Sequence, residues 1–192
     1  MRWAAERSPD VPRLLFGHSM GGALAALVSM EHADLVDLLL MTSPSVKVSE
    51  DISPFLQKIS GIVGTLLPLV PAARLDHELV SRDPEVVKAY LADPLVYNGG
   101  ILARTGHSLL TTEQLILERA ELLNTPFLVL HGSADGLADP RGSETLHERA
   151  SSDDKTIKIY QGLYHEILNE PERAQVRSDL LAWIDERLPA RD

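Results

Sequence analysis

Residues 13–26 read RLLFGHSMGGALAA, and this stretch decides the fold of the chain. The apolar run Leu14–Phe16 meets the pattern Gly-x-Ser-x-Gly around Ser19, and small residues then follow at the density typical of a helix. We expect the glycines two residues before and two residues after Ser19 to be required, because a side chain at either place would collide with the backbone of a tight turn. The stretch therefore predicts a strand, a sharp turn that exposes the Ser19 hydroxyl, and a helix whose N-terminal N–H groups point towards it.

The composition is that of an ordinary globular protein and excludes several classes of function. The 192 residues suffice for one domain with a substantial core, and 44% of them are hydrophobic and 24% charged. The net charge of −10 would repel the phosphates of nucleic acid, so we expect no nucleic-acid partner. Because the chain has no cysteine, disulfides, a thiolate nucleophile and cysteine-bound metals are excluded. Residues 1–12 are polar, unlike a signal peptide, and no apolar stretch reaches the ~18 residues of a membrane span, so we expect a cytoplasmic protein.

Three further apolar runs follow the first and predict a parallel sheet. Leu35–Met41, which Asp37 alone interrupts, and Phe127–Leu130 are short apolar runs, as in strands buried on both faces of such a sheet. Thr156–Tyr160 alternates apolar and polar residues, which is typical of a strand nearer the edge. Helical patterns separate these runs, and strands separated by helices form a parallel α/β sheet flanked by helices.

The C-terminal segment has the pattern of one amphipathic helix. We expect this helix to begin near Pro171, because proline favours the first helical position, with Asn169 as its N-cap. Apolar residues at four-residue spacing would form its core-facing stripe: Val176, Leu180, Ile184 and Leu188.

Residues 45–123 lie between the second and third strands and carry helical patterns without a convincing strand. Phe55–Leu67 has an apolar face over about four turns, which Pro68 and Pro71 end. Two interpretations stay open: a helix packed on the body of the protein, or a cap over the active site whose apolar face lines an acyl pocket or touches a membrane surface. Asp-Pro pairs at 83–84 and 93–94 predict the starts of two further short helices.

A serine hydroxyl is a weak nucleophile and needs a base, which in turn needs an orienting carboxylate. Asp135 comes just after the third strand, and His165 lies in the loop after the fourth. Because the carboxyl ends of parallel strands meet at one edge of the sheet, we expect both side chains at the same edge as Ser19. The sequence therefore predicts catalysis by Ser19, Asp135 and His165.

Other acids and histidines are weaker candidates. Asp139 precedes Pro140 and is expected to cap the next helix, although it is the alternative acid. His131 is expected to be a hydrogen-bonded structural histidine, and His18, inside the turn, to point away from the base. The remaining histidines fall in helical or cap regions and are interpreted as ordinary polar positions: His32, His77, His107 and His147. Because no His, Asp or Glu set has metal-ligand spacing, we expect no metal and no cofactor.

Four stretches together resemble one family. They are GHSMGG at 17–22, DPLVYNGGILARTG at 93–106, PFLVLHGSADGLADPRGS at 126–143 and KTIKIYQGLYHEILNEPE at 155–172. They are similar to the monoglyceride lipase family of α/β-hydrolases, with its lysophospholipase-like and caffeoylshikimate-esterase-like relatives. The resemblance implies carboxylic-ester hydrolysis, with Ser19 as nucleophile, His165 as base and Asp135 as its orienter. It also implies that residues 45–123 are the family's mobile, lipophilic cap.

The chain departs from the family's pattern at its start. The family carries a long portion before the turn, with the first half of the sheet and a His-Gly motif that helps to form the oxyanion hole, whereas this chain reaches its turn at residue 17. We therefore expect residues 1–192 to be a single, N-terminally truncated α/β-hydrolase domain, a partial fold that keeps the C-terminal half of the sheet. The N–H of Met20 is expected as one oxyanion donor, and the second donor has no candidate. The first strand would become an apolar edge.

These observations favour a serine hydrolase that cleaves carboxylic esters of the monoacylglycerol or lysophospholipid type. The expected partner is a small-molecule ester, a single-chain lipid rather than a small aromatic ester because residues 55–67 are apolar, with peripheral membrane contact through the cap. Two alternatives stay open. One is a catalytically impaired homologue that binds a lipid or a protein, and the other is an acyltransferase that uses the same three residues.

Overall fold

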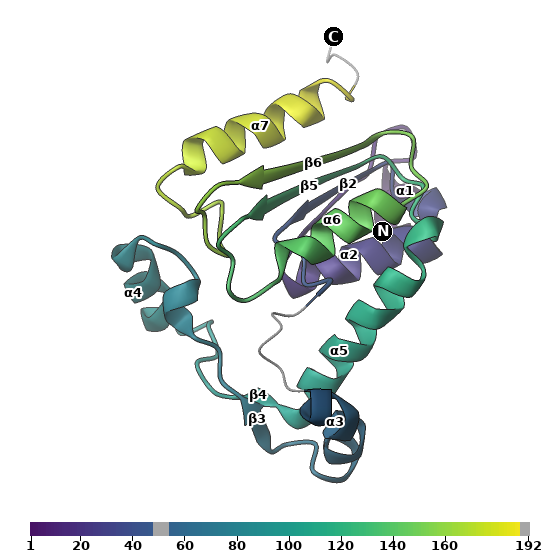
Figure 1. Ribbon diagram of the computed structural model, residues 1–192. Helices are drawn as coiled ribbons and strands as arrows, with labels where there is room; N and C mark the ends of the chain where they lie inside the picture. The colour runs from purple at the N-terminus through teal and green to yellow at the C-terminus, as the bar shows by residue number, and fades with distance from the viewer. Residues whose placement is uncertain (48–53, 189–192) are drawn as a thin grey trace.

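The computed structural model describes residues 1–47 and 54–188, and a parallel sheet forms its centre. Four strands lie in the order β1-β2-β5-β6, each pair parallel (Figure 1). Their bounds are Leu14–His18 for β1, Leu38–Thr42 for β2, Phe127–Gly132 for β5 and Lys155–Tyr160 for β6. The predicted fold class, a parallel sheet flanked by helices, is confirmed.

Both faces of the sheet are covered by helices. On one face lies α7 (Arg173–Asp185), and on the other lie α2 (Met20–Glu31) and α6 (Pro140–Arg149) (Figure 1). Along β2, Leu39 and Met41 belong to the core cluster that contains α2 and α6 residues. Leu38 and Leu40 belong to the cluster on the α7 side. Successive strand residues point to opposite faces, so an unbroken apolar run is what a strand covered on both sides requires.

The outer strands behave as predicted. Within the described residues β1 pairs only with β2, and Phe16 in β1 is 45% exposed. β6 forms the other edge, where Lys158 reaches Asp179 of α7. The first strand is thus an apolar edge, as its sequence indicates.

The helix α7 begins two residues later than predicted. Its N-cap position is Glu172, and the predicted cap Asn169 is wrong, because the Asn169 amide donates instead to the Glu166 carboxylate. The predicted stripe is confirmed: Val176 is buried in the core, and the partly buried members pack against the same cluster, namely Leu180, Ile184 and Leu188. A short helix, α1 (Arg2–Arg7), precedes β1.

The described part of residues 45–123 forms a group of elements beside the sheet (Figure 1). It joins the body of the protein at its C-terminal end, where Ile116, Ala120 and Leu123 belong to the core cluster that contains α2 and α6 residues. Its helices are α3 (Pro54–Leu66), α4 (Pro84–Ala92) and α5 (Ala103–Glu118), and α3 packs against α5. Its strands β3 (Pro71–Ala73) and β4 (Ile101–Leu102) form an antiparallel ribbon. The expectation that this region has no strand is therefore wrong, since strands of two or three residues are too short to show alternation.

The two Asp-Pro pairs of this region differ. Asp83 caps α4 as predicted, because its carboxylate accepts from the Glu85 N–H at 3.0 Å. Asp93 starts a turn and no helix, although its carboxylate also accepts from the N–H two residues on, that of Leu95, at 2.8 Å, and its carbonyl accepts from the Val96 N–H. The apolar side chains predicted at Phe55, Leu56 and Ile59 lie outside the described residues. Among the helices that are described, none has the length and apolar character to cross a bilayer.

Candidate active site

Ser19 lies in the turn between β1 and α2. β1 ends at His18, α2 begins at Met20, and Ser19 between them has φ 54° and ψ −123°. A positive φ is costly for any residue with a Cβ, and such strain persists only where the surroundings hold it. The backbone does hold it, because the Ser19 N–H donates to the Thr42 carbonyl and the Ser19 carbonyl accepts from the Ser45 N–H, both at 3.0 Å.

The two glycines of the motif do not play the same part. A Cβ built on Gly17 would lie 2.3 Å from the Gly21 carbonyl oxygen, which is backbone and cannot move aside. A Cβ on Gly21 would have nothing within 4 Å. The expectation that both glycines are required is therefore wrong for Gly21, which lies in the open first turn of α2.

Alanine at these two positions is expected to change stability in opposite directions. Gly17→Ala should lower the free energy of unfolding by about 2 kcal/mol or more, because the new methyl group overpacks the turn. Gly21→Ala should leave it unchanged or raise it by up to about 1 kcal/mol, because alanine is the better helix former. Urea unfolding of both variants beside the parent protein measures the difference, and equal losses in the two variants would contradict this geometry.

Asp135 and His165 form a buried pair. The Asp135 Oδ2 lies 2.7 Å from the His165 Nδ1, and both side chains are buried. The Asp135 Oδ1 accepts from the N–H groups of Leu137 and Ala138 at 2.8 and 2.9 Å. Burial alone would raise the pKa of Asp135, but hydrogen bonds from His131, His165 and the Ala138 N–H hold it well below its usual value. An ionised carboxylate only accepts, so the His165 Nδ1 carries the proton and Nε2 is the acceptor.

His131 is a second partner of the same carboxylate. Its Nε2 lies 3.1 Å from the Asp135 Oδ2, and its Nδ1 lies 2.7 Å from the Ser143 Oγ. The prediction of a hydrogen-bonded structural histidine is confirmed. Asp139 caps α6 as predicted, accepting from the Arg141 N–H at 2.9 Å, and it also pairs with Lys47.

His18 is placed differently from the expectation that it points away from the base. Its ring centre lies 4.9 Å from that of His165, and its Nδ1 lies 3.0 Å from the Thr42 Oγ1. Burial and the neighbouring His165 lower the pKa of His18. The expectation is wrong because contacts between the ends of two strands decide where the ring lies, and the local pattern carries no sign of them.

Ser19 and His165 line one hollow of about 430 Å³. Met20 lines it too, and as the first residue of α2 it has a backbone N–H with no partner inside the helix. Apolar side chains from both the sheet body and residues 45–123 form much of the wall: Leu75, Leu79, Val80, Ile101, Leu109 and Leu137. Polar groups complete it: His18, Ser45, Arg74, Asp76, Tyr90 and Glu166.

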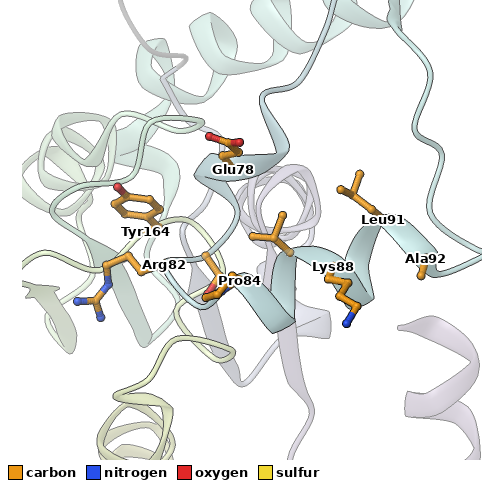
Figure 2. Close-up of a pocket in the computed structure, with 9 residues that line it drawn as sticks. Glu78, Arg82, Pro84, Lys88, Leu91, Ala92 and Tyr164 are labelled. Carbon is orange, nitrogen blue, oxygen red and sulfur yellow. The ribbon is translucent and has the colours of Figure 1, made fainter.

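A larger hollow, about 690 Å³, lies along α4 (Figure 2). Arg82, Pro84, Lys88 and Tyr164 are among the residues that line it, and Ser19, Asp135 and His165 are not. We therefore assign the candidate active site to the smaller hollow, because only that one brings the serine and the histidine to a shared space.

Comparisons with known proteins agree on one family. The family model described as serine aminopeptidase, S33, matches residues 1–172. A monoacylglycerol lipase of Mycolicibacterium smegmatis is 39% identical over 94% of this chain and 65% of its own length. The monoglyceride lipase of Mus musculus is 35% identical over 95% of this chain and 61% of its own. The chain thus spans less than two thirds of the length of these curated relatives.

A solved structure supports the same grouping. The crystal structure of a monoacylglycerol lipase from Paleococcus ferrophilus superposes with a TM-score of 0.84 at 30% sequence identity. The match covers 93% of this chain and 70% of that one.

Proposed function

From the premise that this chain belongs to the α/β-hydrolase family described as serine aminopeptidase, S33, as a monoacylglycerol lipase-like member, we propose that it hydrolyses carboxylic esters. Ser19 is the nucleophile, His165 the general base and Asp135 the group that orients it. One observation carries the proposal: the buried 2.7 Å contact between Asp135 and His165 at the hollow that Ser19 also lines.

The chemistry follows from the protonation states. Asp135 holds the proton on the Nδ1 of His165, which leaves Nε2 to take the proton of the Ser19 hydroxyl as Ser19 attacks the ester carbonyl. The resulting oxyanion is stabilised by the Met20 N–H at the N-terminus of α2. His165 then protonates the leaving alcohol, and a water molecule, deprotonated by His165, hydrolyses the acyl-enzyme.

We further propose a single-chain lipid ester, a monoacylglycerol or a lysophospholipid, as substrate. The hollow has a volume of about 430 Å³ and a largely apolar wall with a few polar groups, which is typical of small-molecule sites. The relatives named above are monoacylglycerol lipases, and such enzymes are carboxylic ester hydrolases.

Product analysis tests this substrate class. The protein is incubated with a monoacylglycerol and, separately, with a lysophospholipid, in the presence and absence of added glycerol as a competing acceptor. We expect free fatty acid as the main product under all conditions. Transfer of the acyl chain to glycerol would identify an acyltransferase instead. Lipid binding without turnover by folded protein would support a binding module.

We also propose that residues 45–123 act as a cap inserted into the domain 1–192, and that this cap touches a lipid surface. From residues 73 to 109 it supplies part of the wall of the hollow, including Leu75, Leu79 and Leu109. Leu66 and Leu69, at and just after the end of α3, are 72% and 76% exposed. Lys58 is the only charge within residues 54–73, so the contact would be apolar rather than electrostatic.

The double variant Leu66→Ser/Leu69→Ser is expected to bind phosphatidylcholine vesicles about 10- to 100-fold more weakly, because a fully buried leucine contributes about 1.5–3 kcal/mol and each of these two would enter the lipid surface only in part. Hydrolysis of a water-soluble short-chain ester should be unchanged. Leu181→Ser on α7, where the leucine is 55% exposed, is the matched control and should bind like the parent protein. Vesicle co-sedimentation measures both. Equal binding by all three proteins would exclude this surface.

A further inference from the structure

Glu170 is a buried carboxylate outside the proposed catalytic residues. Its side chain is 0% exposed, and it lies between the His165 loop and α7. Its Oε1 accepts from the Ser81 hydroxyl at 2.6 Å and from the Arg82 N–H at 2.7 Å. Its Oε2 accepts from the Arg82 guanidinium and, at 3.3 Å, from the N–H of Tyr164. All of these donors come from two short stretches of the chain.

The two stretches belong to different parts of the fold. Ser81 and Arg82 directly precede α4 in residues 45–123, whereas Tyr164 directly precedes His165 in the loop after β6. Arg82 and Tyr164 both line the hollow drawn in Figure 2. Glu170 therefore joins the proposed cap to the loop of the proposed catalytic base.

We call the contact between residues 79–82 and residues 164–170 the junction. Two backbone hydrogen bonds of this junction involve residues that line the candidate active site. The Glu166 N–H donates to the Val80 carbonyl at 2.8 Å, and the His165 N–H donates to the Leu79 carbonyl at 3.4 Å. Leu79 and Val80 are also wall residues of the hollow that Ser19 and His165 line. A shift of this junction would consequently move the wall and the histidine together.

The negative charge of Glu170 requires that its hydrogen-bond donors stay in place. Burial would raise the pKa of Glu170, but hydrogen bonds from Ser81, Arg82 and the Tyr164 N–H hold it below its usual value. A buried carboxylate tolerates ionisation only while such donors stay in place. The anion thus fixes Ser81, Arg82 and Tyr164 in one arrangement, unlike an exposed ion pair, which contributes little.

We propose that Glu170 is a positioning residue that fastens the segment Leu79–Arg82 of the cap to the His165 loop and so sets the position of His165 relative to Ser19. The inference rests on the proposed ester hydrolysis for its effect on turnover, but the junction itself can be tested without substrate.

The test combines turnover per active site with amide hydrogen exchange in Glu170→Gln. The fraction of competent protein is first counted by complete fluorophosphonate labelling, and kcat on a short-chain soluble ester is expressed per labelled site. We expect a 10- to 100-fold loss of kcat with KM within threefold, because a misplacement of about 1 Å costs on the order of 10²-fold. We also expect faster exchange at the amides of Tyr164 and Glu166. A residue that only supports folding would lower the labelled fraction and leave kcat per labelled site unchanged, and that result would overturn the proposal.

The matched control is Glu172→Gln, which removes another carboxylate partner of Arg82, at an exposed position at the start of α7. Its kcat per labelled site and its amide exchange rates at Tyr164 and Glu166 should equal those of the parent protein. A loss of kcat equal to that of Glu170→Gln would overturn the proposal. If Glu170→Gln does not fold, Ser81→Ala decides: a loss of about 2- to 10-fold in kcat with faster Glu166 exchange supports the junction, and no change overturns it. If the parent protein itself hydrolyses no ester, the proposed function fails, and exchange at Glu166 in Ser81→Ala still decides the junction.

Discussion

Ser19→Ala is expected to reduce kcat for ester hydrolysis on the order of 10⁶-fold, as removal of the nucleophile does in serine hydrolases with a comparable triad. The fold should be unaffected. The backbone of Ser19 makes three hydrogen bonds, from its N–H to the Thr42 carbonyl and from the Ser45 and Ala23 N–H groups to its own carbonyl, and none of them involves the hydroxyl. Alanine also has the same Cβ, so the strain at φ 54° is the same. Hydrolysis assays and thermal unfolding of the two proteins measure the effect.

Ser45→Ala is the matched control, because Ser45 lines the same hollow and carries a hydroxyl that donates to Glu113. It should lose less than tenfold in kcat, since the hydroxyl is not the proposed nucleophile. If Ser45→Ala lost as much as Ser19→Ala, or if Ser19→Ala kept a tenth of the activity, the assignment of Ser19 would be wrong.

Asp135→Asn is expected to lower kcat by about 10⁴-fold while the protein stays folded. The asparagine oxygen can still accept from the Leu137 and Ala138 N–H groups, so the loop keeps its shape. Its amide N–H₂ would then face the His165 Nδ1, which would have to accept. The proton would move to Nε2, where it blocks removal of the Ser19 proton. The loss is measured as kcat for ester hydrolysis at pH 7 to 9, and Asp139→Asn is assayed in parallel as the comparison.

The pH dependence of stability gives a second measurement on the same variant. The pKa of Asp135 is lowered in the folded protein, so its contribution to stability is present above its ordinary unfolded value near 4 and is lost as the pH falls below that value. The difference in unfolding free energy between the parent protein and Asp135→Asn should therefore shrink as the pH is lowered below about 4.

Asp139→Asn distinguishes the two neighbouring acids. Asparagine is as good an N-cap as aspartate, so Asp139→Asn should keep the cap of α6 and lose only the ion pairs with Lys47 and Arg141. It should cost at most about 1 kcal/mol of stability and less than threefold in kcat. Equal losses of kcat in Asp135→Asn and Asp139→Asn would contradict the assignment of Asp135.

The sheet could be predicted from the sequence because the apolar residues that mark each strand lie within the strand itself. β2 and β5 are unbroken apolar runs, and both are buried on two faces. The ribbon β3–β4 could not be predicted, because strands this short are held by their pairing across the cap and not by their own residues. Asp93 shows the same limit: an Asp-Pro pair starts either a helix or a turn, and packing decides between them.

The candidate site was predictable in residue type and order, but not in its contacts. Asp135 and His165 follow consecutive strands of the sheet, so their meeting follows from parallel topology. That His131 shares the carboxylate of Asp135, that His18 lies against His165 and that Glu170 reaches back to Ser81 depend on distances across the fold. The hydrophobic pattern of the sequence does not predict these contacts.

The most direct measurement of the central proposal is labelling of the purified 192-residue protein with a fluorophosphonate probe beside Ser19→Ala, followed by mapping of the labelled peptide. Assembly of Ser19, His165 and Asp135 into a working site predicts one label per chain, on Ser19, that is absent from the variant. An unlabelled parent protein in a folded sample, or a label that persists in Ser19→Ala, would contradict the proposal that this chain is a serine hydrolase acting through Ser19.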